Sequence, residues 1–175
     1  MIDVQGQRTW VFDPAYSSVE FTIRNLWFNV RGRFRDFEGR LVLDESDIGR
    51  SSIVATIKAD SVDTGNKRRD AHLLLQDFFD VEKFSDIEFR STSIRRGKDR
   101  DSLDLAGDLR IKDKTVPVAL SVNEMDRSRS PNGEEFVYYS ATAELDRSAF
   151  GINYGRGFIG RRLQVTINVQ ACNTD

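Results

Sequence analysis

The sequence predicts an all-β protein, an antiparallel β-barrel of about eight strands with one short helix inserted between strands near one barrel end. Apolar and polar residues alternate with a period of two over most of the chain, as in strands that bury one face. The links between these segments are mostly short and rich in turn residues, as in "SRSPNG", which indicates antiparallel neighbours. We favour a barrel over a sandwich because closure removes the exposed edges of a long sheet.

Each expected strand is marked by this alternation. It is clearest at Leu163–Ala171, where every second residue is apolar. A short first strand is expected at Trp10–Phe12. The other expected strands cover residues 19–23, 37–43, 53–59, 87–89, 103–111, 116–122 and 137–145. The alternation changes phase between Phe34 and Phe37, which predicts a bulge or bend near residues 35–36.

The expected helix covers residues 68–76, within the insertion "KRRDAHLLLQDFFDVEKF". A helix of about two turns is too short to be stable unless it packs on the barrel, so we predict a lid or plug. His72 is the only histidine of the chain. It either orients the headgroup of a ligand or fixes the lid through a hydrogen bond to Asp70 or a backbone carbonyl, and we favour the structural role.

Strand direction predicts two different barrel ends. If successive strands are antiparallel, alternate connections emerge together, so that links 26–32, 61–85, 112–114 and 147–160 gather at one end. This end is rich in apolar side chains and the other is polar, so a hydrophobic ligand is expected to enter here. The expected inward-facing set mixes phenylalanines with glycines and alanines, which fits an open tunnel and a filled core equally well.

Composition excludes several classes of protein. The length of 175 residues and the hydrophobic content of 39% fit one domain over residues 1–175. The net charge of −2, from intermingled acidic and basic residues, gives no basic field for nucleic acid. Cys172 is the only cysteine, so neither an intrachain disulfide nor a cysteine-rich zinc site is possible. We expect no metal, no cofactor and no catalytic residue.

The first residues, "MIDVQGQRTW", lack the basic and apolar regions of a secretory signal. The expected location is therefore the cytoplasm, with a periplasmic or secreted location if a signal has been removed. The GxGxxG pattern at residues 155–160 precedes an expected strand instead of opening a helix, which indicates a loop and not a dinucleotide site.

Segments along the chain resemble successive motifs of the YceI-like family. They are "TWVFDPAYSSVEFTIRNL", "VRGRFRDFEGRL", "RRDAHLLLQDFFDVEKFSDIEFRSTSI", "GDLRIKDKTVPVAL" and "ELDRSAFGI". The most specific part is Arg69–Leu73 followed by Asp77–Asp80. The resemblance implies an extended lipocalin-like barrel of eight antiparallel strands that holds a long isoprenoid or similar amphiphile, in a family not generally regarded as enzymes. The chain departs from the family pattern at Tyr16, usually histidine, and at Ser85, usually proline.

The expected function is non-enzymatic binding, storage or transport of such a lipid, which could be a polyprenol, a polyprenyl phosphate, a quinone or a fatty-acid-like molecule. Two alternatives remain. One is a ligand-free structural or stress-response barrel that acts through protein partners. The other is an isoprenoid-modifying enzyme, which would need a polar pair near His72, such as Asp70 with Tyr16 or Tyr154.

The expected ligand contacts are the inward-facing residues and those near the apolar end. They are Phe21, Ile23, Phe34, Phe37, Leu41, Ile57, Leu73, Phe78, Phe89, Leu105, Tyr139, Ala141, Phe158 and Val165. The headgroup candidates are Arg69, Asp70 and His72. We also expect Trp27 and Phe28 to touch membranes transiently during ligand exchange, although the apolar end could equally form a homodimer.

Overall fold

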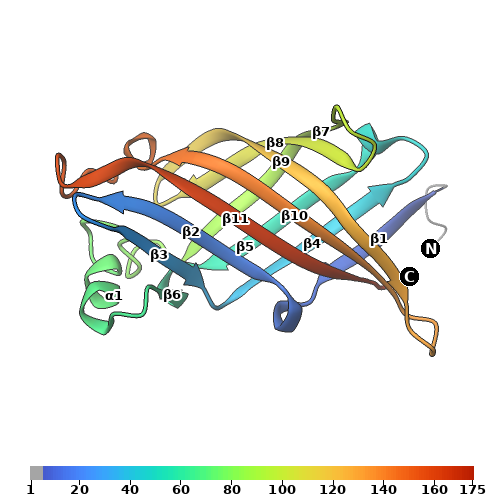
Figure 1. The fold of residues 1–175 in the computed structure, drawn as a ribbon, viewed down its shortest axis with the longest axis horizontal. Helices are drawn as coiled ribbons and strands as arrows, with labels where there is room; N and C mark the ends of the chain where they lie inside the picture. Colours follow the sequence, from blue (N-terminus) through green and yellow to red (C-terminus); the bar gives the residue numbers. More distant parts are fainter. Residues whose placement is uncertain (1–5) are drawn as a thin grey trace.

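Antiparallel strands make up most of residues 6–175, the part of the chain that the computed structural model describes (Figure 1). The strands are β1 (Gln7–Phe12), β2 (Ser18–Asn25), β3 (Asn29–Phe34), β4 (Phe37–Asp44), β5 (Ser52–Lys58), β6 (Val62–Asp63), β7 (Asp86–Arg96), β8 (Ser102–Ile111), β9 (Lys114–Arg129), β10 (Glu135–Asp146) and β11 (Ile159–Asn173). The α-helix of this part is α1 (Lys67–Leu73). Short 3-10 helices lie in the links: η1 (Pro14–Tyr16), η2 (Ile48–Arg50), η3 (Ala59–Ser61) and η4 (Arg147–Phe150).

The sheet closes into a barrel. Its ring runs β1-β4-β5-β7-β8-β9-β10-β11, and pairing of β1 with β11 closes it. Every pair of neighbouring strands is antiparallel. This arrangement confirms the predicted all-β antiparallel barrel of about eight strands with an inserted short helix.

Three of the wall strands are interrupted, which makes the barrel long. β11 pairs with β1 through residues 171–173 and with β2 through residues 163–168, so β1 and β2 follow one another along the same edge. β3 and β4 then pair with β2 and β1, and β6 and β5 pair with β3 and β4. β1 and β2 together therefore form one long strand with a break, and so do β4 with β3 and β5 with β6, as the blue and cyan ribbons of Figure 1 show.

The phase change near residues 35–36 is one of these breaks. β3 ends at Phe34 and β4 begins at Phe37, and both phenylalanines are buried. The expected bend is thus present, but the expectation that residues 26–32 form only a connection was wrong. Residues 29–34 form β3 because they pair with β2 from Arg24 to Val19.

The inserted helix is where the sequence predicts it, but it is shorter. α1 begins after Asn66, whose side chain accepts a hydrogen bond from the backbone N–H of Arg69. It ends at Leu73, because the following residues form turns in which the N–H of Phe79 bonds back to the carbonyl of Leu73. Leu73, Leu74 and Phe79 pack in one hydrophobic cluster with residues of β6 and β8. The segment is therefore built into the wall at one end of the barrel.

The two ends of the barrel contain the connections that strand direction predicts. We call the end with α1, the 26–28 turn, the 112–113 turn and the 147–158 segment the α1 end. The ring of His72 lies 4.8 Å from that of Tyr154, and Lys112 Nζ donates to the carbonyl of Gln76 over 3.2 Å. Asn25 pairs with Ile159. The opposite end, called the far end, contains the 45–51, 97–101 and 130–134 links and lies near both ends of the described chain (Figure 1).

Candidate functional site

A cavity of about 730 Å³ runs through the barrel interior. This volume lies within the roughly 300–1,000 Å³ typical of small-molecule sites. Most of the expected ligand contacts line it, and their contact with a ligand remains a prediction. The lining residues among them are Phe21, Ile23, Phe34, Phe37, Leu41, Ile57, Leu73, Phe78, Phe89, Leu105, Tyr139, Ala141 and Val165. The sequence fitted an open tunnel and a filled core equally well, and the structure has an open interior.

Glycines in the wall keep phenylalanine rings close to the sheet. A Cβ atom at Gly39 would lie 2.2 Å from the ring of Phe12, and one at Gly107 would lie 2.4 Å from the ring of Phe89. Each ring therefore occupies the space that a side chain would need. The mixture of large and small residues seen in the sequence thus places aromatic rings against the wall and leaves room beside them.

Phe158 is the exception among the expected contacts. It is 64% exposed and is not part of the cavity lining. It lies in a turn in which Gly155 and Gly157 have positive φ angles of 70° and 86°, and this turn directs the ring outward. Phe158 therefore lies outside the cavity lining at the α1 end, and its expected contact with a ligand stays a prediction.

Sequence reasoning missed several lining residues. Phe12 lines the cavity and could have been found, because it lies two positions after Trp10 in the expected first strand and so faces the same side as this large apolar residue. Phe79, Phe150 and Ile152 also line it, from irregular links where no alternation marks an inward side chain. Arg147 lines it as well, and nothing in its sequence surroundings distinguishes it from a surface arginine.

Two of the three headgroup candidates reach the cavity. Arg69 and His72 line it, together with Arg68, whereas Asp70 does not. Asp70 instead accepts hydrogen bonds from the backbone N–H of Thr64 over 3.0 Å and from its hydroxyl over 2.5 Å. The carboxylate of Asp70 thus holds the segment before the helix and lies outside the cavity lining, and its headgroup role stays a prediction without support from this geometry.

His72 connects three parts of the α1 end. Its Nε2 lies 3.0 Å from Asp77 Oδ2, and its ring lies edge-on to those of Phe78 and Tyr154, with centroid distances of 5.1 and 4.8 Å. The hydrogen-bond partner is thus Asp77 and not Asp70 as expected. Of the two tyrosines named as partners of Asp70 in an enzymatic pair, Tyr16 is 71% exposed and is not part of the cavity lining, whereas Tyr154 lines it.

Arg147 is a buried cation at this end of the cavity. Its guanidinium donates hydrogen bonds to the backbone carbonyls of Gly160, Ile152, Tyr154 and Ile159, at 2.7 to 3.2 Å. These bonds hold the 147–160 segment in shape. Burial lowers the pKa of the guanidinium, and the charge of Arg156 lowers it further. No carboxylate among residues 6–175 forms an ion pair with it.

Comparison with known proteins assigns this barrel to a family. The model of the YceI-like domain matches residues 10–171. Protein YceI of Salmonella arizonae is 31% identical over 170 residues, which are 97% of this chain and 84% of that protein. Protein YceI of Salmonella paratyphi B matches to the same extent. The chain belongs to the YceI-like family. The resemblance seen in the sequence is therefore confirmed.

Solved structures of YceI-like and related proteins share the fold. BcnA of Burkholderia cenocepacia superposes with a TM-score of 0.82 at 21% identity, over 91% of this chain and 98% of that one. The YceI protein of Campylobacter jejuni gives 0.76 at 24% identity, over 87% and 91%. A polyisoprenoid-binding domain from Saccharophagus degradans gives 0.66 at 13% identity, over 93% and 97%. The extended lipocalin-like barrel predicted from the sequence is thus confirmed.

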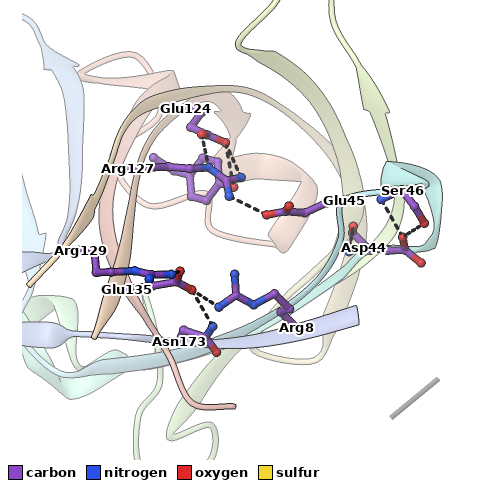
Figure 2. A network of polar contacts seen from close by, with 11 residues as sticks. Arg8, Asp44, Glu45, Ser46, Glu124, Arg127, Arg129, Glu135 and Asn173 are labelled. Carbon is purple, nitrogen blue, oxygen red and sulfur yellow. Dashed lines mark hydrogen bonds and ion pairs between the residues drawn. The ribbon is translucent and has the colours of Figure 1, made fainter. Parts of the chain in front are cut away.

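At the far end, this YceI-like barrel has a network of paired charges (Figure 2). Glu135 accepts hydrogen bonds from Arg129, Arg8 and Asn173, which lower its pKa from 4.5 to about 2. Arg127 bonds to Glu124 and reaches across to Glu45 at 2.6 Å. Strands β1, β9 and β10 and the link after β4 are thereby joined.

Two further features of the far end concern single side chains. Burial and the nearby charge of Glu124 raise the pKa of Tyr139, whose hydroxyl lies 3.4 Å from that carboxylate. Asp44 is fully buried, and its carboxylate accepts bonds from the N–H and hydroxyl of Ser46 and the N–H of Asp47. These bonds lower the pKa of Asp44 and fix the 45–51 link.

Large apolar side chains are exposed at the α1 end, and we call this set the apolar rim. Trp27 is 88% exposed in the turn between β2 and β3. The apolar rim consists of Leu26, Trp27, Phe28, Leu75, Tyr154 and Phe158. Such a group of exposed apolar residues is typical of an interaction surface.

Over residues 6–175, no helix has the length and apolar character needed to span a bilayer. The same part of the chain contains no group of three or more His, Cys, Asp or Glu side chains placed to hold a metal ion.

Proposed function

We propose that this protein binds a long-chain isoprenoid or a similar amphiphilic lipid in its barrel and stores or carries it without changing it chemically. The observation that carries the proposal is the hollow interior, about 730 Å³ and lined along its length by hydrocarbon and aromatic side chains. The likeness in fold to a polyisoprenoid-binding domain supports an isoprenoid chain as the occupant.

Hydrophobic burial is sufficient for tight binding. A chain of roughly 20 carbons, at about 0.8 kcal/mol per buried CH₂, gives on the order of 16 kcal/mol. The cost of association is about 4 to 15 kcal/mol. Binding therefore requires no polar contact, and the headgroup contributes mainly to selectivity.

Native mass spectrometry of gently purified protein tests the proposal, followed by extraction and identification of any released lipid. We expect one isoprenoid or related lipid per barrel. A protein that is repeatedly empty, and that also fails to bind added polyprenols, quinones and fatty acids, would exclude the carrier function. It would then favour the alternative of a barrel that acts through protein partners.

We further propose that the apolar rim contacts membranes while a ligand is exchanged. The exposure of Trp27 and Phe28 supports this, because aromatic rings partition to the membrane interface. Replacing both with serine should slow lipid transfer from vesicles several-fold while leaving equilibrium affinity unchanged. The control is Met125→Ser, which changes an exposed apolar residue of β9 outside the rim.

Unchanged transfer in the Trp27→Ser/Phe28→Ser protein would exclude membrane contact through this turn. Sedimentation of the same variants tests the other use of an exposed apolar surface. If the wild type is a dimer and the double variant a monomer, the apolar rim is an interface between two copies of the chain.

A further inference from the structure

The cavity contains arginines at one end only. Arg68, Arg69 and Arg147 line it, and all three belong to the α1 end. Arg68 and Arg69 lie three to four positions before His72 on α1, so the three residues share one side of the helix. Arg147 approaches from the opposite wall, where it binds the carbonyl of Tyr154, the residue whose ring contacts His72. The three arginines therefore line the cavity at the same end.

None of these arginines has a carboxylate partner within residues 6–175. Arg69 donates to the hydroxyl and carbonyl of Thr64, and Arg147 donates to backbone carbonyls alone. Arg68 is exposed to solvent at the cavity mouth and forms no hydrogen bond with the described residues. By contrast, Arg8, Arg127 and Arg129 at the far end are all paired with glutamates.

The nearby carboxylates bond to groups other than these arginines, although Asp70 and Arg69 share the hydroxyl of Thr64 as a partner. Asp70 bonds to Thr64, and Asp77 bonds to His72. Glu20 and Glu38 touch the cavity, but both are exposed and alternate with inward-facing residues. Glu20 is also five residues along β2 from Asn25 at the α1 end, or roughly 16 Å at about 3.3 Å per residue. The charge of Asp146 acts on Arg147, but Asp146 itself bonds to Ser148 and Arg161. No described carboxylate of the α1 end therefore lines the cavity beside the three arginines or forms an ion pair with them.

We infer that the preferred ligand has an anionic headgroup, a phosphate or a carboxylate, which lies among Arg68, Arg69 and Arg147 while the hydrocarbon chain extends toward the far end. The inference rests on the proposed function and adds the headgroup class to it. An oxyanion supplies both the negative charge and the hydrogen-bond acceptors that guanidinium groups require. A neutral headgroup supplies acceptors but no negative charge, and a buried cation such as Arg147 is costly without an ion-pair partner.

Matched pairs of ligands separate the contribution of the headgroup to affinity from that of the hydrocarbon chain. The pairs are polyprenyl phosphate with polyprenol of the same length, and oleic acid with oleyl alcohol, each measured by calorimetric titration. We expect at least one anion to bind about tenfold tighter than its neutral partner, as charge-assisted hydrogen bonds do. The pair that shows the preference identifies the oxyanion as phosphate or carboxylate. The preference should shrink with added salt, which screens the charges.

Arg68 provides the cleanest variant, because its side chain makes no hydrogen bond that the fold would lose. Arg68→Gln should reduce the preference for the anion several-fold, and Arg68→Glu should reduce it further. Arg96→Gln removes the same charge from an exposed position at the far end of β7 and should leave the preference unchanged.

Equal binding of the charged and neutral members in the wild type would overturn the inference while leaving the proposed function intact. A preference that persists unchanged in Arg68→Glu would overturn the assignment of the headgroup to this end. Failure of all four ligands to bind would instead count against the proposed function itself.

Discussion

The two ends of the barrel use arginine differently. At the far end, Arg8, Arg127 and Arg129 join β1, β9 and neighbouring segments through glutamates (Figure 2). At the α1 end, Arg69 and Arg147 bond only to uncharged oxygens, and their charges remain available. The same residue type thus forms ion pairs at one end of the barrel, whereas the arginines that line the cavity at the other end have no ion-pair partner in the described part of the chain. The difference indicates which end receives the polar part of a ligand.

The largest effect on stability is expected from Arg147→Met. The substitution removes four hydrogen bonds to the carbonyls that shape the 147–160 segment. Allowing for relaxation and hydration of the loop, the free energy of unfolding should fall by roughly 3 kcal/mol. Urea denaturation measures this. Arg161→Met, which breaks a surface ion pair with Asp146 at the same end, should cost much less. Equal losses would mean that the buried guanidinium does not organise this end.

The next largest effect, on ligand affinity, tests how far the hydrocarbon chain of a ligand extends into the cavity from the α1 end. Ala141 is buried, lines the cavity and lies midway along β10. In Ala141→Phe the added ring displaces the end of a long chain, and losing two buried CH₂ groups at about 0.8 kcal/mol each weakens binding roughly tenfold. A short-chain ligand held at the α1 end should bind almost as in the wild type.

The control for this prediction is Thr142→Phe, which places the same ring on the exposed outer face of β10. Affinity for both chain lengths should stay near that of the wild type. If Ala141→Phe weakens the binding of short-chain and long-chain ligands to the same degree, the hydrocarbon chain of the ligand does not begin at the α1 end. The two ends of the barrel would then not have different roles in binding.

A smaller effect is expected from the paired charges of the far end. Hydrogen bonds from Arg129, Arg8 and Asn173 lower the pKa of Glu135 from 4.5 to about 2 in the folded protein. A carboxyl with a depressed pKa contributes stability above its unfolded pKa, and this contribution is lost as the pH falls through the folded value. The melting temperature should therefore drop between pH 4.5 and 2, and the drop should be shallower in Glu135→Gln. If the two proteins show the same dependence of melting temperature on pH, the ionised carboxylate of Glu135 does not stabilise the far end.

Sequence patterns predicted the barrel better than its α1 end. The strands could be found because alternation with a period of two depends only on local order. β3 was missed because its break from β4 at residues 35–36 disrupts that order. The partnership of His72 with Asp77 and the cavity contact of Arg147 arise from tertiary packing. A local sequence pattern does not predict which of several nearby carboxylates a histidine will hydrogen-bond.

The smallest effect on stability is expected from a substitution of His72. It distinguishes a structural role of this residue at the α1 end from a role in ligand recognition. His72→Gln keeps a polar group near Asp77 but loses the edge-on contacts with Phe78 and Tyr154. The free energy of unfolding should fall by about 1 kcal/mol, the usual contribution of one or two aromatic contacts. The ratio of affinities for charged and neutral ligands should not change, unlike in Arg68→Gln. If His72→Gln alters this ratio as strongly, the imidazole contacts the headgroup directly and belongs with the arginines.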